Sequence, residues 1–207
     1  MNKIYVLGVG PGSSEYVLPI VTRLVGESDI IIGGRRNLDI FNLDSKRKMI
    51  IQSNLKEIVD FIKDNREQYK ISVLVSGDPG FYSMLNYLLL HFDQQELEVI
   101  PGISSTQYLI SRMKTCWQDA VLTSLHGRMD KDFLNTVRNH KKVILLTDNQ
   151  YSPDKIARYL MEKGFLHKKV TVGENLSYDD ERIVEGSLQE IAEMRNFQMS
   201  VMVIEDE

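Results

Sequence analysis

The feature that most constrains the fold is the alternation of short apolar runs with longer segments of helical spacing. The apolar runs, each expected to be a strand, occupy residues 3–9, 29–34, 71–75 and 97–100. The segments between and after them, each expected to be a helix, occupy residues 15–27, 54–68, 80–92 and 104–113. Strands that alternate with helices of this length predict a mostly parallel sheet covered on both faces.

The pattern changes after Met113. The stretch 114–131 carries a strand with no obvious crossover helix before it. Helices are then expected at 131–139 and 153–163, and strands at 142–147 and 168–174, followed by two strands around a short helix. We therefore expect two α/β domains. Residues 1–114 would form a Rossmann-like, mostly parallel sheet, and residues 115–207 a mixed sheet.

Charge and cysteine content narrow the class of protein. Lys and Arg number 25 against 29 Asp and Glu, a formal charge of −4, which argues against nucleic acid as a partner. Cys116 is the only cysteine, so the chain can form neither an internal disulfide nor a cysteine-rich metal site. No signal peptide and no apolar run of about 20 residues is present, so we expect a cytoplasmic protein outside the membrane. We expect no metal site, because the histidines lack ligand spacing.

Glycine follows each of the four N-terminal strands. The sequences at these exits are GVGPG (8–12), GGRR (33–36), SGDPG (76–80) and PGISS (101–105). Because ligands bind beyond the carboxyl ends of parallel strands, we expect these loops to share one rim that borders a ligand. Asp78 could accept hydrogen bonds from that ligand, or it could cap the helix that follows.

The first of these loops leaves two interpretations open. GVGPG could bring backbone N–H groups to a phosphate, or it could be a tight loop that needs glycine geometry. A dinucleotide is disfavoured, because the spacing is not G-x-G-x-x-G and the second strand ends without an acidic residue for a ribose.

Several charged residues flank the predicted rim or the domain junction. His126 could be an acid or base, although a lone histidine is more often hydrogen-bonded within the fold. Guanidinium groups suit carboxylates or phosphates, but each arginine taken singly could belong to a solvated surface. The cationic candidates are Arg35, Arg36, Arg112, Arg128 and Lys131.

Taken together, the loops resemble a known family. The stretches VLGVGPGSSEYVLPIVTRLVGESDIIIGGRR, VLVSGDPGFYSM, VIPGISSTQYLISRM and GENLSYDDERIVEGS are similar in order, spacing and content to the tetrapyrrole methylases, over essentially the whole chain. Within that family, GGRR, SGDPGFYS, PGISSTQ and SLHGR most resemble the group that methylates C5 of cobalt-precorrin-7 in cobalamin biosynthesis.

The resemblance implies an S-adenosylmethionine site in a cleft between the two domains of a homodimer, with the tetrapyrrole on the side of residues 1–114. It implies that the cofactor contacts Pro11, Gly77, Asp78, Pro79, Tyr82, Ser104, Ser105, Leu146 and Leu176. A tetrapyrrole carries several carboxylates, so Arg35, Arg36 and Arg128 become its expected partners. His126 would steer or deprotonate this substrate, and no other catalytic residue is expected.

The resemblance also sets the alternatives. The nearest is a family member that acts at another ring position or on another substrate. A tetrapyrrole- or nucleotide-binding module without turnover and a dinucleotide-dependent oxidoreductase come next. Because the chain ends at Glu207, we expect C15 methylation and decarboxylation to fall to a separate protein that could associate with this one. We expect a substrate that already carries cobalt, since freestanding enzymes of this kind more often belong to the cobalt-early route.

Overall fold

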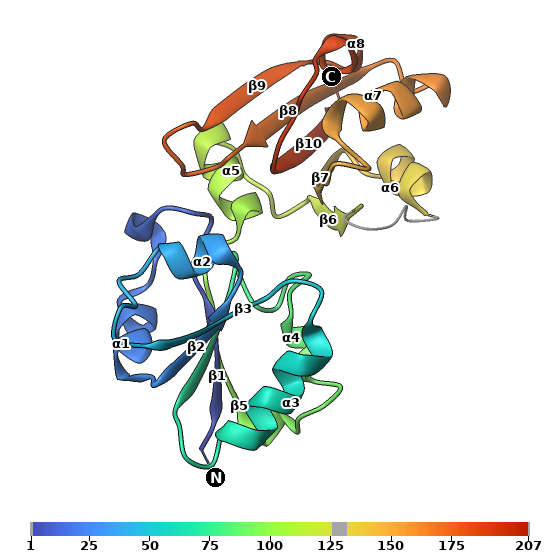
Figure 1. The fold of residues 1–207 in the computed structure, drawn as a ribbon. Coiled ribbons are helices and arrows are strands. Elements are labelled where there is room, and N and C mark those ends of the chain that lie inside the picture. Colours follow the sequence, from blue (N-terminus) through green and yellow to red (C-terminus); the bar gives the residue numbers. More distant parts are fainter. Residues whose placement is uncertain (1, 126–131, 207) are drawn as a thin grey trace. The chain divides into compact units, whose positions relative to one another are not determined.

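The computed structural model describes residues 2–125 and 132–206. The chain divides into two compact units, Met1–Ser104 and Ser105–Glu207, and Figure 1 shows one sheet in each. The two-sheet α/β architecture expected from the sequence is confirmed.

The first unit contains a five-stranded sheet with the strand order β3-β2-β4-β1-β5. All of its strand pairs are parallel. The strands are β1 (Ile4–Gly8), β2 (Ile30–Gly33), β3 (Arg47–Ile50), β4 (Ile71–Val75) and β5 (Leu97–Ile100). The sequence did not predict β3, because its first two residues, Arg47 and Lys48, are charged and exposed at the edge of the sheet.

Helices cover both faces of this sheet. Its helices are α1 (Pro19–Glu27), α2 (Arg35–Asp39), α3 (Leu55–Asn65) and α4 (Leu85–Leu88), with short 3-10 turns at Ser14–Tyr16 and Gln94–Glu96. Side chains such as Ile32 and Val73 pack with α3 and α4 in one apolar cluster. Side chains such as Ile31 and Leu74 point the other way and pack with α1 and α2. The alternation follows from the two-residue repeat of a strand.

Two helices are shorter than expected. The helix predicted at 15–27 begins at Pro19, because proline fits only the first turn of a helix. The helix predicted at 80–92 is reduced to α4, because Tyr82 has a positive φ of 48° that interrupts helical geometry. The Ser83 hydroxyl donates to the Pro79 carbonyl and accepts from the Leu85 N–H, which delays the start of the helix.

The second unit contains a mixed five-stranded sheet with the order β6-β7-β10-β8-β9. Only β6 and β7 pair in parallel, and the other neighbours are antiparallel. The strands are β6 (Val121–Ser124), β7 (Lys142–Leu146), β8 (Lys168–Glu174), β9 (Arg182–Ser187) and β10 (Ser200–Asp206).

Its helices are α5 (Ser105–Met113), α6 (Phe133–Asn139), α7 (Pro153–Glu162) and α8 (Leu188–Glu193). The last three enclose a core with β7, β8 and β10. Helix α5 contacts β7 and β10, and its Leu109 would lie 2.7 Å from a side chain added at Gly173. These contacts assign α5 to the second unit, whereas a boundary near Lys114–Thr115 would place it in the first.

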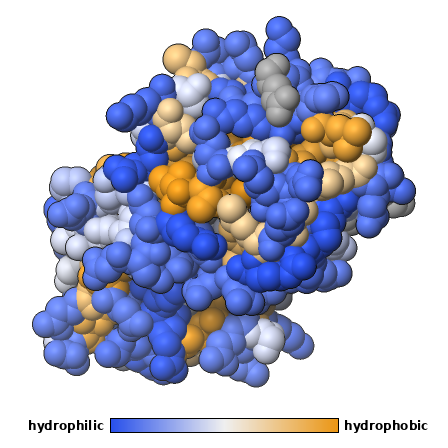
Figure 2. All heavy atoms as spheres, turned by 90° about the horizontal axis from the view of Figure 1, so that it is seen from above, coloured by the Kyte–Doolittle hydropathy of each residue, from blue (hydrophilic) through white to orange (hydrophobic). Residues whose placement is uncertain are grey.

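Polar and charged side chains dominate the face drawn in Figure 2, where hydrophobic residues reach the surface only in patches. Across residues 2–125 and 132–206, no helix combines the length and hydropathy needed to cross a bilayer.

Candidate functional site

The four glycine-bearing loops lie at one edge of the first sheet. Strands β1, β2, β4 and β5 are parallel, so the loops that follow them leave from the same carboxyl edge. This edge is the rim expected from the sequence.

Three of these loops approach one another through glycine backbone. A side chain at Gly102 would place its Cβ 2.3 Å from the Gly77 carbonyl oxygen and 2.7 Å from the Gly8 carbonyl oxygen. A side chain at Gly8 would come within 2.6 Å of the same Gly77 oxygen and of the Gly102 nitrogen. Real Cβ atoms do not tolerate such distances to backbone. The exits of β1, β4 and β5 can therefore meet only because glycine stands at these positions.

The β1 and β4 loops are also joined by a hydrogen bond. The Gly77 N–H donates to the Gly10 carbonyl at 2.8 Å, and both residues have positive φ, 64° and 81°. Glycine adopts this left-handed region without steric cost. The GVGPG and SGDPG motifs thus form one backbone assembly rather than two independent turns.

Asp78 ties the same assembly to the β5 loop. One carboxylate oxygen accepts the Gly80 N–H at 2.8 Å, and the other accepts the Gly102 N–H at 3.2 Å. The first contact closes the turn of Asp78 itself, and the second reaches a loop 24 residues further along the chain. Both oxygens are therefore engaged in hydrogen bonds to backbone, one within the turn and one to the β5 loop. This arrangement assigns Asp78 a structural role at the rim.

The remaining predicted residues of this rim differ in exposure. Pro11 and Pro79 are buried in their loops. Tyr82 is 55% exposed, and its ring lies edge-on to that of Phe81 with centroids 4.9 Å apart. A bulky residue with positive φ is strained, and such strain often marks functional loops. The backbone thus presents the Tyr82 ring to solvent next to the Gly77–Asp78–Pro79 turn.

Arg35 and Arg36 lie at the same edge. They form the first turn of α2, which starts directly after β2, and both are exposed. Two guanidinium groups at the rim can receive carboxylates or phosphates. The structure therefore brings these arginines to the same rim as the Gly77–Asp78–Pro79 turn.

Ser104 and Ser105 lie where the two units meet in sequence. Ser104 is 8% exposed and ends the first unit, and Ser105 begins α5 of the second.

Leu146 and Leu176 lie at one edge of the second sheet. Leu146 ends β7, and Leu176 follows β8; both strands run antiparallel to β10 between them and so end on the same side. Leu146 is half-buried, whereas Leu176 is only 3% exposed. The edge is apolar at both positions.

The turn around Leu176 has unusual backbone geometry. Its neighbours Asn175 and Ser177 have positive φ values of 47° and 68°, although neither is glycine. The Glu181 carboxylate holds the turn, accepting the Ser177 N–H at 2.7 Å and the Arg112 side chain at 3.1 Å. The Asn175 amide also donates to Asp180 at 2.7 Å. Side chains thus impose a conformation that the backbone disfavours.

The predicted substrate and catalytic residues His126 and Arg128 lie outside the described residues, and so does Lys131.

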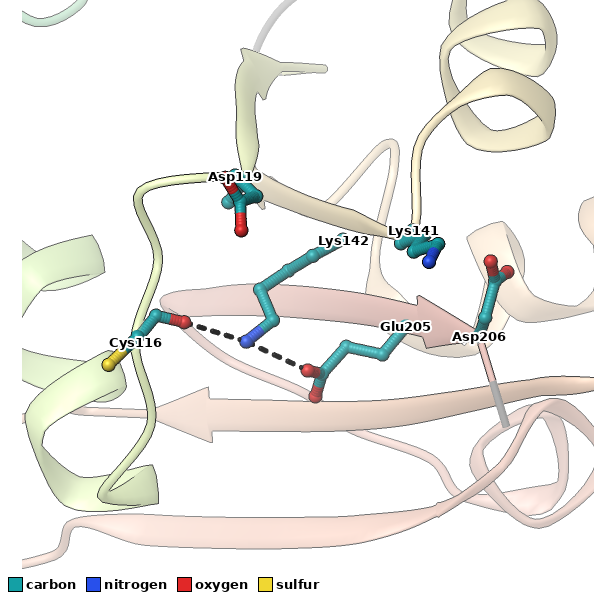
Figure 3. Close-up of a pocket in the computed structure, with 7 residues that line it drawn as sticks. Cys116, Asp119, Lys141, Lys142, Glu205 and Asp206 are labelled. Carbon is teal, nitrogen blue, oxygen red and sulfur yellow. Dashed lines mark hydrogen bonds and ion pairs between the residues drawn. The ribbon is translucent and has the colours of Figure 1, made fainter.

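A separate pocket opens at the opposite edge of the second sheet, where β7 begins and β10 ends (Figure 3). It is lined by Cys116, Asp119, Ala120, Lys141, Lys142, Glu205 and Asp206. The Lys142 ammonium group donates to the Cys116 carbonyl at 2.8 Å and pairs with Glu205 at 3.0 Å. It also reaches the Thr115 hydroxyl at 3.1 Å, so its donors are occupied in fixing the segment before β6.

Within 2–125 and 132–206, no three His, Cys, Asp or Glu side chains are grouped so that they could hold a metal ion.

The sequence did not single out three polar residues that organise these edges. Asn37, Ser76 and Glu181 each form a side-chain hydrogen bond to another residue at their edge. Gly8 and Gly102 lay within the quoted motifs but were not predicted individually. The two glycines could have been predicted, because each lies where a predicted strand ends. The three polar residues belong to no comparable sequence pattern.

Comparison with known proteins identifies the family of the chain. The family model for Tetrapyrrole (Corrin/Porphyrin) Methylases matches residues 3–192. The "Probable cobalt-precorrin-7 C(5)-methyltransferase" of Methanocaldococcus jannaschii is 37% identical, with 91% of each chain covered. The cobalt-precorrin-7 C(5)-methyltransferase of Salmonella typhimurium is 33% identical, with 98% of each covered. The cobalt-precorrin-4 C(11)-methyltransferase of M. jannaschii is 28% identical, with 93% of this chain and 81% of the relative covered.

A solved structure shows the same fold. Uroporphyrin-III C-methyltransferase from Thermus thermophilus, complexed with S-adenyl homocysteine, has a TM-score of 0.78 and 21% identity, with 99% of this chain and 97% of that chain covered. The family model spans most of the chain, and the two C(5)-methyltransferases align with nearly all of it. The chain therefore belongs to the tetrapyrrole (corrin/porphyrin) methylase family and is a methyltransferase.

Proposed function

We propose that this chain transfers a methyl group from S-adenosylmethionine to C5 of cobalt-precorrin-7 in cobalamin biosynthesis. The observation that carries the ring position is the ranking of its relatives. Two proteins named for C(5) methylation are 37% and 33% identical to the chain. The C(11)-methyltransferase of the same archaeon as the first is 28% identical.

The rim of the first sheet supports the donor site. The glycine contacts keep side chains out of the space between the β1, β4 and β5 exits, so backbone can approach a ligand closely. The methionine part of the donor meets the Gly77–Asp78–Pro79 turn and Tyr82, with Pro11, Ser104 and Ser105 contributing further contacts. Leu146 and Leu176 border the adenine ring.

The substrate is held by charge. Arg35 and Arg36 are exposed on the first turn of α2, at the same rim as the proposed donor loop. Together with Arg128 they bind carboxylates of the tetrapyrrole, and His126 steers or deprotonates it. A guanidinium group can bind one carboxylate through two parallel hydrogen bonds.

Such a site needs little acid–base chemistry. The donor supplies a methyl group already activated on a sulfonium, and a reduced tetrapyrrole offers an electron-rich carbon. The residues of the chain therefore have to orient the two reactants and exclude water, and aligned geometry can contribute about 7–11 kcal/mol. This agrees with Asp78, whose two carboxylate oxygens are engaged in backbone hydrogen bonds.

The ring position can be tested directly. We would incubate the purified chain with cobalt-precorrin-7 and S-adenosylmethionine carrying a labelled methyl group, and locate the label by mass spectrometry and NMR. A single label at C5 is the expected result. Label at another ring position would favour the alternative, a family member with a different target, which the 28% identical C(11)-methyltransferase keeps open. A parallel reaction with the cobalt-free precursor tests the expectation that cobalt is already present.

Carboxylate recognition has its own test. Arg128→Ala should weaken tetrapyrrole binding and leave S-adenosylmethionine affinity unchanged. The control is Arg23→Ala, because Arg23 is exposed on α1 and pairs with Glu27 in the same helix. Unchanged tetrapyrrole affinity in Arg128→Ala would contradict the role.

The proposal extends to assembly and location. We expect a cytoplasmic homodimer and association with a separate C15-methylating decarboxylase. Light scattering on the purified chain tests the first expectation: a dimer mass supports it, and a monomer mass at micromolar concentration contradicts it.

A further inference from the structure

Asn37 is a buried polar residue on the same short helix as the exposed arginines. It follows Arg35 and Arg36 in α2, yet it is only 9% exposed. Its backbone N–H donates to the Gly34 carbonyl at 2.9 Å, so it belongs to the first turn of the helix. The arginines thus face solvent while their neighbour points into the fold.

The Asn37 amide faces one acceptor and one donor. Its Nδ2 donates to the Leu74 carbonyl oxygen at 3.4 Å, and its Oδ1 accepts the Ser76 hydroxyl at 2.9 Å. A carboxylate of the same shape could not donate to Leu74, and an apolar side chain could do neither. Only a side-chain amide satisfies both partners at this position.

The two partners lie at the end of β4. Leu74 belongs to β4, and Ser76 directly precedes the Gly77–Asp78–Pro79 turn. The Asn37 amide therefore fastens α2 to the strand exit that becomes the proposed donor loop. Leu38 adds an apolar contact, since it packs in the same buried cluster as Leu74.

This link completes a chain of contacts along the rim. The Gly77 N–H joins the β4 loop to the β1 loop, and Asp78 joins it to the β5 loop. Asn37 adds the β2 exit through Ser76. The packing of Leu38 with Leu74 is apolar, and such a contact has no preferred direction, whereas the two hydrogen bonds of the Asn37 amide do.

We propose that Asn37 is a positioning residue, acting through Ser76, that fixes the substrate arginines relative to the methyl-donor loop. The inference rests on the proposed function. Methyl transfer requires the reacting carbon to be aligned with the donor, and a small displacement can lower the rate strongly while each reactant still binds. Loss of the link should therefore reduce kcat more than it changes the affinity for S-adenosylmethionine.

The test uses the full chain and four variants. Asn37→Asp keeps the shape but removes the donor to Leu74, Ser76→Ala removes the hydroxyl, and Ser76→Thr restores one. Ser72→Ala is the matched control, because Ser72 lies in β4, the strand that leads to Ser76, and its hydroxyl is paired with that of Ser28 at 2.7 Å. We would measure kcat and KM with cobalt-precorrin-7, the Kd for S-adenosylhomocysteine, and the melting temperature.

Asn37→Asp and Ser76→Ala should each lower kcat about 10-fold, with the Kd for S-adenosylhomocysteine within about 2-fold of wild type. Ser76→Thr should recover most of the loss. Ser72→Ala should lower the melting temperature while kcat stays at the wild-type value.

Two results would overturn the positioning role. One is that the wild type is active and the Ser76→Ala variant has the same kcat as the wild type. The other is a loss of kcat in Ser72→Ala as large as in Ser76→Ala, because general destabilisation would then explain both. Ser76→Ala decides the matter even if Asn37→Asp fails to fold, since Ser76 is exposed. A wild type that binds S-adenosylhomocysteine but methylates no tetrapyrrole would overturn the proposed function, and this role with it.

Discussion

Two turns, one in each unit, reach positive φ by different means. The turn after β4 has Gly77 at φ 64°, and its neighbours approach through the backbone of Gly8 and Gly102. The turn after β8 has Asn175 and Ser177 at φ 47° and 68°, and the Glu181 carboxylate holds it. The positive φ of the first turn falls on a glycine, which has no side chain, whereas side-chain hydrogen bonds hold the non-glycine residues of the second. Mutations should therefore affect the two turns through opposite mechanisms.

The largest effect is expected for Gly102→Ala. The new Cβ would lie 2.3 Å from the Gly77 oxygen and 2.7 Å from the Gly8 oxygen, and backbone atoms cannot move away as a flexible side chain can. We expect a loss of about 3 kcal/mol in the free energy of unfolding, measured with urea, together with loss of S-adenosylhomocysteine binding.

Gly26→Ala in α1 is the control, because nothing lies within 4 Å of its added Cβ. It should stabilise the helix by about 0.5–1 kcal/mol. Equal effects of the two substitutions would show that the rim has room for side chains.

Asp78→Ala should have the second largest effect. It leaves the Gly80 and Gly102 N–H groups without their carboxylate acceptor, which should cost about 2 kcal/mol. Asp64→Ala on the exposed side of α3 should change the unfolding free energy by less than about 0.5 kcal/mol. A mild Asp78→Ala phenotype would mean that water replaces the carboxylate and that the loops are held by glycine contacts alone.

Glu181→Gln tests the side-chain mechanism in the second unit. The amide can still accept one hydrogen bond, but it loses the charge that attracts Arg112. Since the Arg112 side chain is 56% exposed, we expect a modest loss of about 1 kcal/mol in urea unfolding.

Glu185→Gln on β9 is the comparison for that variant, because its exposed pair with Lys169 should contribute little. If both variants behave alike, Glu181 does not hold the turn.

The smallest effect is expected for Ser177→Gly. Glycine relieves the steric cost of φ 68°, but it also makes the unfolded chain more flexible. These terms nearly cancel, so the free energy of unfolding should stay within about 0.5 kcal/mol of wild type. Ser177→Val, which is stiff at this backbone geometry, should cost about 1–2 kcal/mol. A stable Ser177→Val would contradict the strained geometry of this turn.

The contrast between these two turns also explains which parts of the fold and the site could be predicted from the sequence. The parallel sheet and its rim were predictable, because apolar runs fix the strands and glycine marks their exits. The conformation of the turn at Leu176 was not predictable. Asn175, Ser177 and Glu181 form no recognisable motif in the sequence, and the contact of Glu181 with Arg112 of α5 is visible only in the folded structure. That pairing joins residues 69 positions apart in the chain.

Local competition accounts for the other differences. The helix expected over 80–92 is interrupted because the Ser83 hydroxyl binds the Pro79 carbonyl and Tyr82 takes a positive φ. The role of Asn37 could not be predicted, because the sequence does not show whether an asparagine side chain is buried or exposed. Its role depends on Leu74 and Ser76, which only the folded sheet brings beside it.

The central claim is that the glycine-built rim of the first unit belongs to a methyl-donor site. Titration calorimetry of the purified chain with S-adenosylhomocysteine and with NAD tests it most directly. We predict binding of S-adenosylhomocysteine in the wild type and in Ser72→Ala, its loss in Gly102→Ala, and no response to NAD. Tight NAD binding without any response to S-adenosylhomocysteine would contradict the claim.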